Sequence, residues 1–251
     1  MRQKKALSSN NRTFLAMTIP IVILFFLFNT LPLITGAVYS FTNYRGYGSF
    51  DFVGLRNYID LFSDERVLHS YLFTFKYAIA GTILINVLSL LLAMGLNSRI
   101  RCKSLLRGVY FVPNILGGLI VGVWQAVAMN TIIYISGLQT VPADIYEAGM
   151  IDGANPWQKF WKLTFPMLLP FVSINLILST KNMMMVFDQI MSLTKGGPAQ
   201  STESISYLIY KNGMDGGQFG FQSANAVIFF IVIVAFSIIQ MKITGKKEEQ
   251  L

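Results

Sequence analysis

Three long apolar blocks constrain the fold of this chain more than any other feature. They cover residues 14–38, 71–96 and 221–241, and each reaches the ~20 apolar residues that a helix needs to cross a bilayer. Of the 251 residues, 53% are hydrophobic and 13% are charged, whereas soluble domains average roughly 45–50% and 25%. The sequence therefore predicts an all-α fold, that of a polytopic α-helical membrane protein.

The arrangement across the membrane follows from lysine and arginine, which accumulate on the cytoplasmic side of short loops. An uncharged block at 108–138 is too long for one crossing and too short for two. If this block returns to its starting side, 13 basic residues lie inside and five outside; if it crosses once, the split is ten against eight. The first topology is preferred, with cytoplasmic tails at 1–13 and 242–251 and a membrane domain at 14–241. A further span is predicted at 167–187, with extracytoplasmic loops at 40–69 and 188–222.

The composition also excludes some classes of function. A net charge of +8 raises the question of nucleic acid. The basic residues, however, lie at the ends of apolar blocks, where they orient helices and meet lipid head groups. We therefore expect membrane lipid, and no nucleic acid, as a partner. The single cysteine, Cys102, excludes an internal disulfide and a cysteine-based metal cluster, and no metal site is predicted.

The polar segment at 141–170 is too organised for a passive linker. It contains residue types that start, cap and restart a helix, in the order Pro142, Asp144, Glu147, Gly153 and Asn155-Pro156. We expect a helix, a glycine turn and a second short helix at 157–162, along the membrane surface. Ala148 and Gly149 reduce side-chain bulk beside Glu147, which suits docking in a groove of another protein. The alternative, an amphipathic helix resting on lipid, is weakened by the scarcity of basic residues before Lys159.

Two stretches resemble a known family. Glu147-Ala148-Gly149, then Gly153, then Leu163-Thr164-Phe165-Pro166 follow the order and spacing of the EAA loop of bacterial ABC importer permeases. The departures, at Gly149, Leu163 and Phe165, are toward small or apolar equivalents. Downstream, residues 186–190, 193–198, 201–203 and 219–220 are similar to the external loop of the maltose-type, first-permease-like subunit of sugar importers. The resemblance covers residues 15–243.

This resemblance implies a permease fold of six spans that carries a sugar or oligosaccharide by alternating access. It implies a bacterial plasma (inner) membrane location, with both termini cytoplasmic. The implied partners are a second permease subunit, two ATPase subunits and an extracytoplasmic sugar-binding protein. ATP and Mg²⁺ would bind the ATPase subunits and no cofactor would bind this chain, which has no G-x-x-x-x-G-K-[ST] phosphate loop.

The resemblance also assigns residues to two contact regions. The EAA loop at 139–166 would couple to the ATPase through Glu147, Ala148, Gly149, Asp152, Gly153 and Pro166. The loop beneath the binding protein would include Gly196, Gly197 and Pro198. Uncharged polar side chains in the later spans are candidates for the substrate pathway, namely Gln125, Asn130, Asn175, Ser179 and Asn182. Each of these has an alternative role in bonding a neighbouring helix.

One departure from the family concerns the third and fourth spans. Residues 108–122 match the third and 123–138 the fourth, and the external loop that separates them in the family is missing. We therefore expect these two spans to be shortened or fused. The first alternative function is a truncated, transport-incompetent permease that only binds its partners. The second, a self-contained secondary transporter, predicts a carboxylate within the membrane, and none lies inside the proposed spans.

Overall fold

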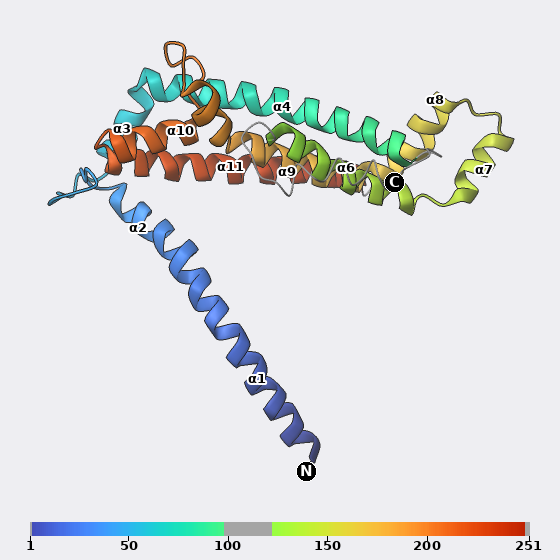
Figure 1. Ribbon diagram of the computed structural model, residues 1–251, viewed down its shortest axis with the longest axis horizontal. Helices are drawn as coiled ribbons and strands as arrows, with labels where there is room; N and C mark the ends of the chain where they lie inside the picture. Colours follow the sequence, from blue (N-terminus) through green and yellow to red (C-terminus); the bar gives the residue numbers. More distant parts are fainter. Residues whose placement is uncertain (1, 98–121, 249–251) are drawn as a thin grey trace. The chain divides into compact units, whose positions relative to one another are not determined.

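The computed structural model describes residues 2–97 and 122–248, with side chains described for residues 14–97 and 124–245. The chain divides into two compact units. The first joins Met1–Asp64 to Ile209–Ile228, and the second joins Glu65–Leu208 to Phe229–Leu251. Helices make up most of the described residues of both units (Figure 1).

The first unit begins with one long helix. α1 (Arg2–Phe25) continues through a π-helical turn, η1 (Phe26–Thr30), into α2 (Leu31–Tyr39). Within it, residues Phe14–Tyr39 are apolar and long enough to cross a membrane. The unit also holds α3 (Arg56–Ser63), the π-helical turn η5 (Lys211–Asp215) and the first part of α11 (Phe219–Glu248).

The start of α11 lies against the chain that follows α2. The amide N–H of Gly220 donates to the carbonyl oxygen of Tyr44 at 2.7 Å. In the same unit, the Asn57 side-chain amide donates to the carbonyl oxygens of Ser40 and Thr42, each at 2.8 Å. A Cβ added at Gly220 would collide with the carbonyl oxygen of Thr42. Glycine at this position is therefore required by the close approach of two backbone segments.

We expect Gly220→Ala to lower the free energy of unfolding by about 2–4 kcal/mol, because the added methyl group forces the two backbones apart and breaks their hydrogen bond. Thermal unfolding of the purified protein in detergent measures the change. Gly36→Ala is the matched control, since a Cβ at this helical glycine meets no atom within 4 Å. Equal unfolding temperatures for the two variants would contradict the close approach.

The second unit is a bundle of membrane-length helices with two short helices at one end (Figure 1). Its long elements are α4 (Glu65–Asn97), α6 (Gly122–Thr140), α9 (Phe165–Met184) and the later part of α11. Its short elements are α7 (Ala143–Ile151), α8 (Pro156–Lys159), the π-helical turns η3 (Phe160–Thr164) and η4 (Ile190–Thr194), and most of α10 (Ile205–Tyr210). α4, α6 and α9 pack against one another.

A shared apolar cluster fixes the directions of α4, α6 and α9. It contains Ala93, Leu96, Tyr134, Ile135, Leu138 and Leu168. Leu96 and Leu138 lie near the C-terminal ends of α4 and α6, whereas Leu168 lies near the N-terminal end of α9. α4 and α6 are therefore parallel, and α9 is antiparallel to both. α6 returns the chain to the end of the bundle at which α4 finished, as the preferred topology requires.

The observed helices confirm the predicted all-α membrane fold and revise several boundaries. Four helices are long and apolar enough to cross a membrane, namely Phe14–Tyr39, Glu65–Asn97, Pro156–Met184 and Phe219–Gly245. The predicted extracytoplasmic loop at 40–69 contains α3 and the start of α4, where Glu65 favours the positive end of the helix. Of the predicted tails at 1–13 and 242–251, the described residues 2–13 and 242–248 are helical and belong to α1 and α11. Most of the stretch predicted as a third span lies outside the described residues.

Candidate functional site

The helix α7 presents one continuous exposed face. Asp144, Glu147, Ala148 and Ile151 are all exposed, and their spacing of three, one and three residues places them on the same side of a helix. Ile151 is 86% exposed, which is unusual for a large apolar side chain. The face therefore combines two carboxylates, a small residue and an uncovered apolar residue.

The opposite face of α7 packs against η3. Gly149 is buried, and a Cβ added there would lie 2.6 Å from Cδ1 of Leu163. The Thr164 hydroxyl donates to the Tyr146 hydroxyl at 3.1 Å. Gly149 thus faces the rest of its own chain, although the EAA resemblance places it among the ATPase-coupling positions.

The turn after α7 is held by backbone and side-chain caps. Gly153 has φ of +70°, and its amide N–H donates to the carbonyl oxygen of Met150 at 3.1 Å. Asn155 and Gln158 form a reciprocal capping box at the start of α8, with bonds of 2.8 and 3.0 Å. The predicted helix, glycine turn and second helix are confirmed, but the second helix does not stop at residue 162.

Instead, α8 continues through η3 into α9 without a break in the chain of helical turns. Pro166 lies at the start of α9, directly after the π-helical turn η3. Asp152 is exposed at the C-terminal cap of α7. A force on the exposed face of α7 would therefore reach a membrane-length helix through a short, capped turn.

A second candidate region is residues 194–203, which lead from the end of η4 towards α10 and belong to the predicted extracytoplasmic loop. Lys195, Gly196, Ala199 and Gln200 all have positive φ, between 46° and 82°, so three residues other than glycine adopt the left-handed conformation. The Thr202 hydroxyl donates to the carbonyl oxygen of Gly197 at 2.7 Å. The loop exposes Pro198, Ala199 and Gln200 and buries Gly196.

An ion pair lies beneath this loop. The Arg66 guanidinium, at the start of α4, donates to the two carboxylate oxygens of Glu203 at 2.7 and 2.6 Å. The Glu203 side chain is only 1% exposed, and that of Arg66 is 30% exposed. A Cβ at Gly196 would lie 2.8 Å from Cγ of Glu203, while the Tyr207 hydroxyl donates to the Lys195 carbonyl oxygen at 2.9 Å. The ion pair therefore braces the buried side of the loop.

The third candidate region is a buried polar cluster between α4, α6 and α9. The Ser179 hydroxyl donates to Oδ1 of Asn130 at 3.0 Å, and the Asn175 amide donates to the Asn130 carbonyl oxygen at 3.2 Å. Asn86 joins them, since its amide donates to the Ser179 hydroxyl at 3.2 Å and its Oδ1 accepts from Tyr134 at 2.7 Å. These hydrogen bonds link three helices. The buried residues therefore have the role that was the alternative to lining a substrate pathway, namely bonding a neighbouring helix.

The five pathway candidates therefore fall into two groups. Asn130, Asn175 and Ser179 are buried together, and Oδ1 of Asn175 has no hydrogen-bond partner among the described residues. Asn182 is exposed and Gln125 is half-buried. Within the part of the chain that the structure describes, no group of three or more His, Cys, Asp or Glu side chains could hold a metal ion.

Comparison with known families identifies the family of this chain. The family described as "Binding-protein-dependent transport system inner membrane component" matches residues 8–247. The chain belongs to this family. It is a multi-pass membrane protein and a permease subunit, in agreement with the resemblance carried by its EAA-like loop.

Relatives of known name match nearly the whole permease. It is 34% identical to the multiple sugar-binding transport system permease protein MsmF of Streptococcus mutans, over 94% of this chain and 95% of the relative. It is 31% identical to the probable starch degradation products transport system permease protein AmyD of Thermoanaerobacterium thermosulfurigenes, over 88% of this chain and 90% of the relative.

Solved structures show the same fold at low identity. A chain of a bacterial alginate ABC transporter, crystallised with an alginate pentasaccharide-bound periplasmic protein, superposes with a TM-score of 0.80. The match covers 96% of both chains at 17% identity, and a second alginate transporter structure gives a TM-score of 0.81. The fold of the permease is therefore that of an ABC importer permease.

The relatives also contain residues that this permease lacks. The aligned region with the Streptococcus mutans relative is 279 residues long, whereas the permease has 251 residues in all. The relative must therefore hold additional residues within that region. The expected shortening of the third and fourth spans around residues 122 and 123 stays a prediction; the structure describes the predicted fourth span as α6, beginning at Gly122.

Sequence reasoning missed two features of the candidate regions. It noted Asp144 only as a helix-start residue and assigned no site role to Ile151, yet both lie on the exposed face with Glu147 and Ala148. The spacing of these four residues could have revealed the face. It also missed the partnership of Arg66 and Glu203, which are 137 residues apart, and no local pattern signals such a pair.

Proposed function

We propose that this permease carries a sugar or short oligosaccharide across the bacterial plasma membrane. The supporting observation is that relatives matching most of its length are named as permeases for starch degradation products and for multiple sugars. An extracytoplasmic binding protein delivers the sugar, by analogy with the alginate transporter crystallised with its periplasmic protein. A second permease subunit completes the translocation path. Membership of a binding-protein-dependent family does not favour a self-contained secondary transporter.

Two partner ATPase subunits supply the energy in this proposal, and ATP and Mg²⁺ bind to them rather than to this chain. The exposed face of α7 docks in a groove of one ATPase, where Glu147 and Asp144 contact basic groups and Ile151 is covered. Closure of the ATPase pair moves α7, and the capped turn passes that movement through η3 to α9. The helices then alternate between inward-open and outward-open arrangements.

Uptake of radiolabelled sugar tests the substrate class. The permease is expressed with its partner subunits and binding protein, and uptake of maltose, trehalose and maltotriose is compared with that of an amino acid. We expect ATP-dependent uptake of at least one of the sugars and none of the amino acid. A complex that assembles but takes up none of these sugars would support the truncated, transport-incompetent alternative.

We expect the turn after α7 to face the cytoplasm, because the preferred topology places 13 of the basic residues inside. A single cysteine is introduced by Asp152→Cys in a Cys102→Ser background, and intact cells are treated with a membrane-impermeant thiol reagent. Cys102 alone serves as a second cytoplasmic position. We expect no labelling at position 152 until the cells are permeabilised.

Asp188→Cys in the same background is the matched control, since residue 188 is an exposed aspartate beyond the opposite end of α9. It should be labelled in intact cells. Labelling of position 152 from outside would mean that no cytoplasmic ATPase reaches α7, and the proposed coupling would be wrong.

A further inference from the structure

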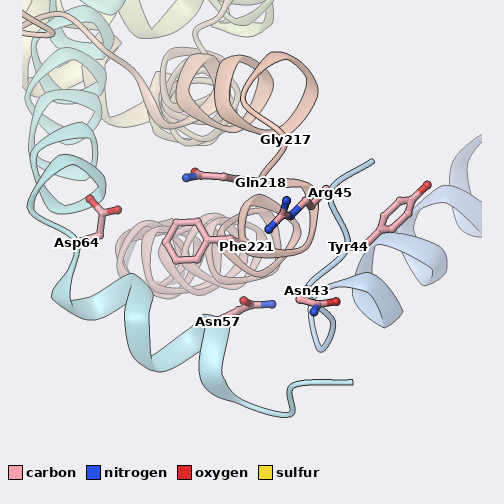
Figure 2. A pocket seen from close by; sticks show the side chains of 8 residues that line it. All are labelled: Asn43, Tyr44, Arg45, Asn57, Asp64, Gly217, Gln218 and Phe221. Atoms are coloured by element: carbon pink, nitrogen blue, oxygen red, sulfur yellow. The ribbon is translucent and has the colours of Figure 1, made fainter. Parts of the chain in front are cut away.

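Two adjoining pockets lie in the first unit, beside the segment that follows α2. One has a volume of about 310 Å³ and is shown in Figure 2; the other has a volume of about 320 Å³. Tyr44 and Arg45 line both. Each volume is at the lower end of the range of about 300–1,000 Å³ that is usual for small-molecule sites.

The first pocket presents hydrogen-bonding groups that the protein does not use itself. The side chains of Arg45 and Gln218 make no hydrogen bond to any residue that the structure describes. The side-chain NH₂ group of Asn57 donates to the carbonyl oxygens of Ser40 and Thr42. Its Oδ1 remains available as a hydrogen-bond acceptor. A guanidinium, an amide and a fixed carbonyl oxygen thus converge on one cavity.

Aromatic rings supply the apolar surface of both pockets. Phe221 lies in the middle of the first pocket in the view of Figure 2, with Asp64 and Arg45 to either side. In the second pocket, Tyr44 and Phe219 meet edge to face with ring centroids 5.5 Å apart. Tyr47 also lines this pocket and is 73% exposed. Tyr44 is stacked on Tyr39 with ring centroids 4.5 Å apart, so Phe221 and Tyr47 are the rings left to contact a ligand.

The charges favour a neutral ligand. The pair of pockets carries one cation, Arg45, and one anion, Asp64, among its lining residues. A phosphate or an acidic sugar would gain from Arg45 but be repelled by Asp64, whereas a neutral hydroxyl group can accept a hydrogen bond from Arg45 without that repulsion. A sugar ring has apolar faces and hydroxyl groups around its edge. Its faces can stack on the aromatic rings, and its hydroxyl groups can bond the polar side chains beside them.

We propose that these two pockets form a binding site for a short neutral saccharide at the extracytoplasmic end of the permease. Arg45, Gln218 and Oδ1 of Asn57 bond its hydroxyl groups, and Phe221 and Tyr47 stack against its rings. The site would receive the sugar before it enters the helices. This inference rests on the proposed function, because it takes residues 43–64 to be extracytoplasmic and the cargo to be a sugar.

Protection of a single cysteine tests this site. Met214→Cys is made in a Cys102→Ser background, because Met214 lines the second pocket, is 66% exposed and is not among the proposed ligand contacts. The full transporter in intact cells is treated with an impermeant thiol reagent, with and without free sugar. The probe is whichever of maltose, trehalose and maltotriose the uptake experiment shows to be carried. At ten times the dissociation constant, labelling should slow about elevenfold.

Variants and controls separate the site from other causes of protection. Arg45→Ala and Gln218→Ala, each added to the labelling background, should raise the sugar concentration for half-protection at least about tenfold, equal to about 1.4 kcal/mol. Asp60→Cys is the control position, because its side chain is 57% exposed in the same unit and does not line either pocket. Its labelling should be unaffected by sugar.

Three outcomes would overturn the site. Sugar that slows labelling at neither position, or equally at both, would show no ligand in the pockets. Protection by sugar-free binding protein alone would identify a protein-docking surface instead. A transporter that carries the sugar but shows no protection would refute the site and leave the proposed function intact, whereas absence of uptake for every sugar refutes the proposed function.

Discussion

Arg66→Met is expected to lower the free energy of unfolding by about 3–5 kcal/mol, because it leaves the Glu203 carboxylate buried without its cation. The Glu203 side chain is 1% exposed and both of its oxygens accept from Arg66, at 2.6 and 2.7 Å. A carboxylate in that position has little water to compensate for the lost partner. Thermal unfolding in detergent measures the loss of stability.

The same variant should also loosen the loop at residues 194–203. Gly196 packs against Cγ of Glu203, with space for no side chain of its own, so a displaced Glu203 removes the support beneath residues 194–203. Lys195 is exposed in this loop, and trypsin cleaves after lysine. We expect cleavage at Lys195 to become faster in Arg66→Met, as detected by the size of the fragments.

Two further variants test whether the loss of stability arises from the burial of the ion pair. Arg66→Met combined with Glu203→Leu should recover most of the stability, because it removes both charges from the buried site. Arg56→Met breaks the exposed pair of Arg56 and Asp60, whose side chains are 77% and 57% exposed, and should cost less than about 1 kcal/mol. Equal losses for Arg66→Met and Arg56→Met would contradict the bracing role of the buried pair.

The parts of this fold that sequence predicted are those with local causes. A bilayer-spanning helix needs a run of apolar residues, and the runs near residues 14–38 and 71–96 are each visible without any tertiary information. The turn after α7 was predicted because Gly153 and Asn155 have strong conformational preferences of their own. The return of α6 to the end of α4 followed from the distribution of basic residues, which responds to the membrane rather than to packing.

The parts that sequence did not predict depend on contacts between distant segments. Nothing near Gly149 indicates that it faces Leu163 rather than a partner, because the family motif fixes residue types and not the side of the helix. The bonds from Asn86 to Ser179 and from Arg66 to Glu203 join residues 93 and 137 positions apart. α3 was missed because its eight residues lie in a polar loop, too short for a clear helical period.

The exposed face of α7 gives the second large effect. We expect Glu147→Lys to reduce co-purification of the ATPase with the permease at least about tenfold, equal to about 1.4 kcal/mol, because it places a cation against the basic groups that we propose on the ATPase. Sugar uptake should fall with it. The amount of permease in the membrane should be unchanged, since Glu147 is exposed and makes no side-chain hydrogen bond among the described residues.

Asp188→Lys is the matched control, because it makes the same change of charge on an exposed aspartate beyond the opposite end of α9. It should leave ATPase co-purification at the wild-type level. Ile151→Ser tests the apolar part of the face, where 86% exposure of the side chain leaves little role in folding but a large area for a partner to cover. It should weaken co-purification without reversing any charge.

Combining the two variants then separates docking from structural damage. If Glu147 and Ile151 contact the same ATPase groove, the double variant should lose less than the sum of the two single losses, and basic-to-acidic changes on the ATPase should restore binding to Glu147→Lys but not to Ile151→Ser. Unchanged co-purification and uptake in Glu147→Lys would refute the assignment of α7 as the coupling helix. The exposed Ile151 would then need a different partner.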